Sequence, residues 1–362
     1  MKFLIVFVGL AVAAGAALGG LAWQLGYFAP AGDPTTFTVQ KGENFSSLAR
    51  QLQGAGIIRR ERALRWYVNI LGAGKGLKRG EFSLYKNMPV PALVKALTEG
   101  KPIEYKVTIP EGFNLYQIAD LLAQGGFAKK KDFVEAAQDL ELIAALPTLA
   151  KGERQPKSLE GYLYPNTYLV QKVETPLEIV QSMVHHFREV YAELKPELER
   201  SAVVQEFHFT PHQVVTLASI VEKETGAAAE RPLIASVFLN RLRKHMRLQT
   251  DPTIIYSLWL THGSWDGNIR RRDLDAKNEY NSYQMDGLPP GPISNPSKSA
   301  IQAVLNPAQA DFLYFVSRGN GTHIFSKDYA AHAKAVRETQ LNPKVRSERG
   351  SWRSLPADQR AK

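Results

Sequence analysis

The feature that most constrains this chain is an uncharged, apolar run at its amino terminus. No charged residue lies within residues 3–32, and residues 3–23 are almost wholly apolar. A helix needs about 20 such residues to cross the hydrocarbon core of a bilayer. We therefore expect a single transmembrane anchor helix within residues 1–28.

Basic residues flank this run unequally, which predicts its orientation. Lys2 precedes the run, and the next basic residue after it is Lys41. By the positive-inside rule, the body of the protein then lies outside the cytosol. A cleaved signal peptide is the alternative, because the Ala/Gly-rich residues 11–20 could hold a cleavage site. The apolar core of a signal peptide spans about 7–15 residues, so this longer run favours a retained anchor. In either case the body is exported, and we expect no nucleic-acid partner.

Composition narrows the available chemistry. The 362 residues contain no cysteine, which excludes disulfides, thiol nucleophiles, thiolate zinc sites and iron–sulfur clusters. The adjacent His185 and His186 point about 100° apart on a helix, so they cannot chelate one metal ion together. We expect neither a metal nor a cofactor. A net charge of +10 suits an anionic polymer or membrane surface.

The region that follows the anchor begins with a pattern that recurs later. A strand-like run at residues 36–39 leads into a glycine turn and a helix that Asn44 can cap. The matching positions are Thr38, Gly42, Asn44, Ala49, Leu52 and Gly56 in the first copy, and Thr108, Gly112, Asn114, Ala119, Leu122 and Gly126 in the second. We expect one strand–turn–helix unit used twice. The first copy resembles the first half of a LysM glycan-binding module, and a plain βα unit is the alternative interpretation.

The most informative segment for chemistry is residues 212–226, HQVVTLASIVEKETG. At 100° per residue its aliphatic side chains form a wide apolar arc, and Glu222 and Glu224 fall on opposite flanks of that arc. A carboxylate on an apolar face must be paired, protonated or functional. A salt bridge to Arg231, Arg241 or Arg243 is the structural alternative to a functional role.

Of these two carboxylates, Glu224 is the better candidate for an acid. It lies in the last turn of the expected helix, which Gly226 is placed to end, and the negative end of the helix dipole raises a carboxyl pKa there. Leu217, Ile220 and Val221 desolvate it further. A carboxyl that stays protonated near pH 7 can protonate a glycosidic oxygen. Glu224 is therefore the candidate general acid.

Several later segments carry the rings and amides that carbohydrate sites use. Residues 231–243 form a second amphipathic helix, residues 248–253 a polar loop, and residues 280–293 a turn-rich stretch with tyrosines. Asn295 is placed to cap a helix over residues 296–305. Residues 312–316 and 323–325 predict a hairpin across an Asn-Gly turn. Such loops could equally serve only to specify the fold.

Motifs in fixed order along the chain resemble those of one enzyme family. They are LEGYLYP at 159–165, SIVEKET at 219–225, NRL at 240–242, LQTDPT at 248–253, YNSY at 280–283, GLPPGPI at 287–293 and YFV at 314–316. Together they resemble the motifs of the YceG-like endolytic murein transglycosylases. The resemblance runs from the anchor to about residue 342.

This resemblance implies a single-pass protein of the bacterial inner membrane, with a periplasmic body that cleaves nascent peptidoglycan glycan strands and so ends their elongation. The family's catalytic glutamate matches Glu224, the residue that the dipole argument also selects. A lytic transglycosylase uses one carboxyl, first as acid and then as base, to form a 1,6-anhydro product at N-acetylmuramic acid. Peptidoglycan synthases are candidate partners, although no residue identifies one. The residues expected to bind or position the sugar are Glu222, Asn240, Gln249, Asp251, Tyr280, Asn281 and Tyr283.

Departures from the family pattern occur at Asn166, Ser297 and Ala333, where Asp, Gly and Asn are usual. None of them touches the EKET or LQTDPT segments, so we expect activity to survive. Two other functions remain as alternatives. One is a muramidase-type hydrolase with Asp251 as base, because ordinary glycosidases need two carboxylates. The other is a non-catalytic, wall-binding scaffold.

The expected fold class is α+β, with a mostly helical catalytic domain that contains short strands and a hairpin. We divide the chain into an anchor (1–28), a LysM-like membrane-proximal module (29–101), a βα connecting region (102–195), a catalytic region (196–342) and a basic, disordered tail (343–362).

Overall fold

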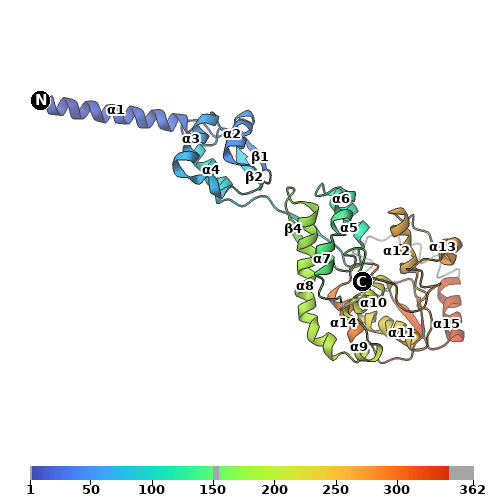
Figure 1. Cartoon of the computed structure of the whole chain (residues 1–362). Coiled ribbons are helices and arrows are strands. Elements are labelled where there is room, and N and C mark those ends of the chain that lie inside the picture. The colour runs from blue at the N-terminus through green and yellow to red at the C-terminus, as the bar shows by residue number, and fades with distance from the viewer. Residues whose placement is uncertain (1, 150–154, 342–362) are drawn as a thin grey trace. The chain divides into compact units, whose positions relative to one another are not determined.

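The computed structural model describes residues 2–149 and 155–341, and its chain divides into two compact units (Figure 1). Unit 1 comprises Met1–Val107 and Leu169–Glu174, and unit 2 comprises Thr108–Tyr168 and Thr175–Lys362. Helices dominate the described residues, and the strands are short and paired in twos. The expectation of a helix-rich fold with few strands is confirmed. The expected tail, residues 343–362, lies outside the described residues.

Helix α1 (Lys2–Gln24) opens unit 1 and contains the apolar run. Its segment Phe7–Gln24 has a mean hydropathy of 1.5, and none of that segment is buried in the protein. By length and composition this helix is able to cross a membrane. Both a retained anchor and a signal sequence can satisfy these two criteria.

The rest of unit 1 surrounds a small two-stranded sheet. Strand β1 (Pro34–Val39) pairs antiparallel with β2 (Gly80–Tyr85), so that Phe37 lies opposite Phe82. Between and after the strands lie α2 (Phe45–Gly54), α3 (Glu61–Leu71), the 3₁₀ turn η1 (Ala73–Gly76) and α4 (Val90–Thr98). The apolar faces of these helices bury residues such as Leu48, Leu52, Leu64, Leu93 and Leu97. Leu71, the last residue of α3, is 58% exposed.

The repeated pattern folds as the same local unit in both copies. Asn44 caps α2, and Asn114 caps α5 (Leu115–Gln124), each through a reciprocal capping box. The turn glycines Gly42 and Gly112 have φ of 84° and 70° respectively, in the left-handed region that favours glycine. The predicted strand, glycine turn and Asn-capped helix are therefore confirmed in both places.

Unit 2 begins with short elements around the second copy. Strand β3 (Tyr105–Thr108) pairs with β4 (Thr167–Val170), and the chain passes from one unit to the other within each strand. After α5 come α6 (Lys130–Ala136) and α7 (Leu140–Ala144).

The larger part of unit 2 packs around one central helix. The surrounding elements are α8 (Pro176–Arg200), α9 (Ala202–Phe207), η2 (Ala228–Glu230), α11 (Arg231–Arg243), α12 (Asp251–His262), α13 (Arg271–Asp275), α14 (Lys298–Leu305), α15 (Tyr329–Val336) and the π-helical turn η3 (Arg337–Leu341). The central helix is α10 (Pro211–Glu224), which packs against α11, α12 and α14. Its aliphatic residues are fully or almost fully buried, as the apolar arc predicted. The hairpin of β5 (Tyr314–Ser317) and β6 (His323–Ser326) is also confirmed.

Two local expectations are wrong. Ser297, not Asn295, caps α14, because the Asn295 side chain is fully buried and bonds to other elements. Helix α10 ends because Thr225 is extended, with φ −142° and ψ 136°, rather than through a left-handed Gly226.

Candidate active site

Helix α10 directs its two terminal carboxylates into different surroundings. Glu222 forms an ion pair with Arg231 at 2.6 Å, and these side chains are 4% and 6% exposed. Its second oxygen accepts hydrogen bonds from the Ser297 backbone N–H at 2.9 Å and from the Ser297 hydroxyl at 2.6 Å. The Glu222 carboxylate is thus bound within the fold, as the salt-bridge alternative predicted for this residue.

Glu224 instead lines an open cavity of about 350 Å³. The lining residues are Glu224, Arg241, Gln249, Thr250, Asp251, Tyr283, Tyr314, Phe315, Tyr329 and His332. Burial raises the pKa of Glu224 to about 7, and the negative charge of Asp251 adds to this. A hydrogen bond from the Thr250 hydroxyl to Oε1 and the positive charge of Arg241 act in the opposite direction. The result is a carboxyl that exchanges its proton near neutral pH.

The segment that carries Thr250 is held by the YNSY segment. The Gln249 N–H donates to the Ser282 carbonyl at 3.1 Å, and the Thr250 N–H donates to the Ser282 hydroxyl at 2.9 Å. Gln249 has φ of 47°, a left-handed conformation that redirects the chain just before α12 begins. The Tyr283 hydroxyl donates to Asp251 Oδ1 at 2.6 Å. These bonds bring Gln249, Asp251 and Tyr283 to the same cavity as Glu224.

Arg241 closes one side of the cavity from α11. Its guanidinium donates to the carbonyls of Leu313 at 2.7 Å and Leu248 at 2.5 Å, and lies 5.4 Å from the centre of the Tyr314 ring. Burial lowers the pKa of Arg241, although its ordinary value is so high that it stays charged. Arg241 therefore ties the LQTDPT segment to the residue before the hairpin and supplies positive charge beside the Glu224 carboxyl.

His332 of α15 also lines the cavity. Its ring stacks on Tyr314, with centroids 5.1 Å apart and an angle of 22° between the ring planes. Burial and the charge of Arg241 lower the pKa of His332, which favours the neutral imidazole. Its Nδ1 is buried and has no hydrogen-bond partner among the described residues.

Two predicted sugar-binding residues are used inside the fold instead. The Asn240 amide donates to the carbonyls of Ala310 at 2.7 Å and Phe312 at 3.0 Å. Asn281 is fully buried, and its amide donates to three carbonyls of the segment around α13. Both side chains fix loops near the cavity, and neither lines it.

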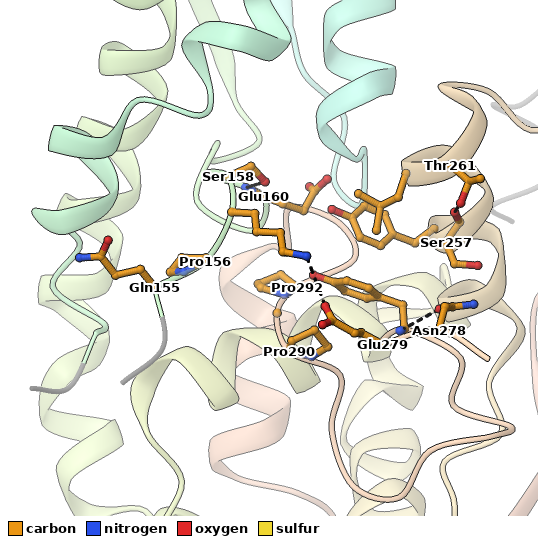
Figure 2. Close-up of a pocket in the computed structure, with 15 residues that line it drawn as sticks. Gln155, Pro156, Ser158, Glu160, Ser257, Thr261, Asn278, Glu279, Pro290 and Pro292 are labelled. Carbon is orange, nitrogen blue, oxygen red and sulfur yellow. Dashed lines mark hydrogen bonds and ion pairs between the residues drawn. The ribbon is translucent and has the colours of Figure 1, made fainter. Parts of the chain in front are cut away.

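Tyr280 lies in a second, larger cavity of about 450 Å³, which also contains Glu160 (Figure 2). Burial raises the pKa of Glu160 to about 8. Its two carboxyl oxygens accept bonds from the Leu115 N–H at 2.9 Å and the Asn295 amide at 3.0 Å, and Lys157 at the rim pairs with Glu279 at 3.4 Å. Glu160 and Lys157 thus each have a partner within the protein, whereas the smaller cavity contains both Glu224 and His332.

Four predicted site residues therefore meet in one cavity: Glu224, Gln249, Asp251 and Tyr283. Sequence reasoning assigned no role there to Thr250, Tyr314, Phe315, Tyr329 or His332, and considered Arg241 only as a salt-bridge partner. Thr250 belongs to the LQTDPT motif, and Tyr314 and Phe315 belong to the YFV motif. Their place in these motifs was the signal that could have identified them as site residues. For Tyr329 and His332 the sequence offers only their place after the hairpin.

Comparisons with known proteins agree on one family. A family model described as the YceG-like family matches residues 37–338. A Bacillus subtilis (strain 168) protein named endolytic murein transglycosylase is 34% identical over 309 residues, which cover 82% of this chain and 82% of that protein. A protein of the same name from Streptococcus pneumoniae (serotype 2, strain D39) is 31% identical over 86% of this chain, which spans 59% of that relative. A crystal structure of a YceG-like protein from Listeria monocytogenes matches with a TM-score of 0.55 and 35% identity, covering 84% of this chain and 99% of that one.

Proposed function

This chain belongs to the YceG-like family, and from that premise we propose that it is a lytic transglycosylase that cleaves peptidoglycan glycan strands. The names of the relatives support this activity. The observation that carries the proposal is the Glu224 carboxyl, which lines an open cavity with a pKa raised to about 7. A carboxyl of this pKa can give up a proton and take it back near neutral pH.

Glu224 performs both proton transfers of the proposed reaction. As general acid it protonates the oxygen that bridges C1 of N-acetylmuramic acid to C4 of N-acetylglucosamine, and the C1–O bond breaks. As general base it then accepts the proton of the muramyl C6 hydroxyl while that oxygen bonds to C1. The product ends in 1,6-anhydro-N-acetylmuramic acid, no water is consumed, and the carboxyl returns to its starting state. Because one group serves twice, the site does not need a second catalytic carboxylate.

The remaining groups of the cavity suit a sugar substrate. Tyr283, Tyr314 and Phe315 offer ring faces, on which pyranose rings stack, and Gln249 offers an amide for hydroxyl groups. We assign Gln249, Asp251 and Tyr283 to substrate binding. Glu222, Asn240 and Asn281 use their polar atoms within the fold, so we now assign them to positioning the segments around Glu224. Tyr280, which lines the second cavity, keeps no direct role in the reaction.

The anchor and the domain plan belong to the same proposal. Helix α1 is a retained single-pass anchor in the bacterial inner membrane, and the body acts in the periplasm on nascent strands, as a terminase of their elongation. The order β1, α2, α3, β2 supports a LysM-like module at residues 29–101. The further division at residues 102–195 and 196–342 remains a prediction.

The decisive experiment compares the native protein with Glu224→Gln on purified sacculi, with mass spectrometry of the released ends. The native protein yields anhydromuramyl ends, and the folded variant yields none. If the folded variant still releases them, Glu224 is not the acid. Sacculus binding is measured in parallel, because a non-catalytic scaffold would bind without releasing ends from either protein.

A muramidase-type hydrolase is the second candidate, because Asp251 lines the same cavity as Glu224. Two carboxylates across the scissile bond are what hydrolysis by such enzymes requires. The products distinguish the two reactions, since hydrolysis leaves a reducing sugar that is heavier by one water. Under the transglycosylase mechanism Asp251→Asn weakens the reaction without changing the product, whereas under hydrolysis it removes the base.

A further inference from the structure

Helix α3 of unit 1 exposes large apolar side chains on the side that faces away from its core. Trp66 is 47% exposed and Ile70 is 62% exposed, although Leu64 and Val68 of the same helix are buried. At 100° per residue, these two residues share an arc of about 140° with three polar residues. We name this arc the outer face of α3, and its residues are Arg62, Arg65, Trp66, Asn69 and Ile70.

The chain around this face is strongly basic. Residues 59–79 contain seven basic residues and one acidic residue, Glu61; the basic ones are Arg59, Arg60, Arg62, Arg65, Lys75, Lys78 and Arg79. A helix with Trp and aliphatic residues on a face bordered by Arg and Lys is typical of segments that lie in a membrane interface. Its charge is complementary to that of anionic headgroups.

The outer face also lies directly beside the end of α1. Ala17, Gly20, Leu21 and Gln24 of α1 share a cavity of about 490 Å³ with Arg62, Ala63 and Trp66 of α3. The Arg60 guanidinium lies 4.5 Å from the centre of the Trp23 ring. Leu25, just past α1, is buried in the core of unit 1, and its carbonyl accepts a bond from the Val90 N–H at 2.9 Å. The end of α1 is thus packed onto α3, as Figure 1 also shows.

This packing determines how deep α3 lies when α1 spans a bilayer. A span of about 20 residues that begins near residue 3 ends near residue 22, and each residue adds about 1.5 Å. Ala17, Gly20 and Leu21 then lie within about one and a half turns of the end of the span. Trp66, which borders the same cavity, lies at the same depth. Trp23, Tyr27 and Phe28, all about half exposed or more, provide the aromatic belt expected at that level.

We propose that the outer face of α3 docks on the anionic phospholipid bilayer that holds α1. Trp66 and Ile70 enter the interface, while Arg62 and Arg65 contact lipid phosphates. The proposal rests on the insertion of α1, which is part of the proposed function, but it does not depend on catalysis. Unit 1 is then held against the membrane at two places and cannot swing freely on a single helix.

The test uses the full chain, whose lack of cysteine allows one fluorophore to be attached at a chosen position. Leu10→Cys reports on α1, Ile70→Cys reports on the outer face, and Ser46→Cys on the exposed side of α2 is the matched control. Each labelled protein is reconstituted in vesicles of phosphatidylcholine and phosphatidylglycerol with a doxyl-lipid quencher. We expect blue-shifted, quenched emission at positions 10 and 70, and unshifted, unquenched emission at position 46.

The three labels separate the possible failures. If position 10 is quenched but position 70 is quenched no more than position 46, the docking is overturned and the anchor stands. The outer face of α3 would then be free for another partner. No quenching at position 10 overturns the anchor and the docking together. A second experiment tests the role of charge. The double variant Arg62→Gln/Arg65→Gln should reduce the quenching at position 70, whereas the control variant Arg50→Gln on α2 should not. Equal effects of the two changes would contradict the role of the arginines.

Discussion

The hydroxyl of Thr250 donates a hydrogen bond to Oε1 of Glu224, and this contact joins the LQTDPT segment to the last residue of α10. The bond stabilises the carboxylate form and so lowers a pKa that burial raises. Burial and the Thr250 hydrogen bond therefore act in opposite directions on the pKa of Glu224, and each effect can be changed separately.

Replacing Thr250 by Val should move the alkaline limb of the pH–rate profile to higher pH. A general acid must be protonated, so activity falls as the pH rises through the pKa of Glu224, about 7. Without the hydroxyl the carboxylate loses a stabilising bond and that pKa rises. The rate of release of anhydromuramyl ends across pH 5–9 measures the shift. Thr216→Val is the control, because that hydroxyl bonds to the His212 carbonyl on the same helix; a limb that does not move with Thr250→Val contradicts the assignment.

Glu224→Gln should stabilise the protein at pH 8 and have much less effect at pH 5. A carboxyl whose pKa rises from 4.5 to about 7 on folding binds its proton more tightly in the folded state. The folded state therefore loses stability as the pH rises from 4.5 through 7, and the neutral amide avoids that loss. We expect a gain of about 1–3 kcal/mol in the free energy of unfolding at pH 8. Urea unfolding at both pH values tests this, and an equal gain at both would show that ionisation is not its cause.

Glu222→Gln should destabilise the protein through its partner. The change removes the 2.6 Å ion pair of the buried Arg231 and leaves only its 3.1 Å pair with Glu111, whose side chain is 55% exposed. Breaking a buried pair costs about 3–5 kcal/mol. The matched control is Glu206→Gln, which breaks a pair of equal length with Arg243 whose side chains are 44% and 39% exposed. An exposed pair contributes at most about 1 kcal/mol. Equal losses in urea unfolding would mean that burial of the Glu222 pair is not what matters.

Gly112→Ala and Gly42→Ala separate local strain from contact with α10. Both glycines are left-handed, so each alanine costs about 1–2 kcal/mol. A Cβ at Gly42 meets nothing within 4 Å, whereas one at Gly112 lies 3.3 Å from Glu222 Cγ and 3.4 Å from Lys223 Cδ. Because these residues immediately precede Glu224, Gly112→Ala should also reduce activity in folded protein, and Gly42→Ala should not. Retained activity in Gly112→Ala would show that the end of α10 tolerates displacement.

Glu160→Ala should unfold more easily because two buried donors, the Leu115 N–H and the Asn295 amide, lose their acceptor. Each unsatisfied group costs about 1–3 kcal/mol. The pKa of Glu160 is raised to about 8, so its ionisation opposes folding and the native protein should lose stability as the pH rises from 4.5 through 8. The pH dependence should be weaker in Glu160→Ala. Glu279→Ala, at the rim of the same cavity, should change stability by less than about 1 kcal/mol; a similar loss there would contradict the role of burial.

Periodic and capping patterns predicted most of the local structure. The spacing of apolar residues predicted the helices of residues 212–226 and 231–243, and the repeat predicted two Asn-capped helices after glycine turns. Helical arithmetic also separated Glu222 from Glu224. These features depend on residues within one or two turns of each other, which a single sequence displays directly.

The sequence could not show how polar residues are shared between structure and site. Asn240, Asn281 and Gln249 are equally plausible ligands for a sugar, yet the first two bond to backbone carbonyls and only Gln249 reaches the cavity. Asn295 was a good helix cap by type, but its amide is bound between Phe113 and Glu160. The Asn240 and Asn295 contacts join segments 70 to 182 residues apart, and no local pattern in the sequence contains them.

The division of unit 1 into residues 1–107 and 169–174 has a consequence for the order in which the protein is built. A chain is synthesised from its amino terminus, so β3 is made well before β4, its partner strand. Until residues 167–170 emerge, β3 presents an open edge on the nascent chain. The first segment of unit 2, residues 108–168, is made in that interval. Unit 1 is therefore completed only after unit 2 has begun, and biogenesis must protect an unpaired strand for the length of that segment.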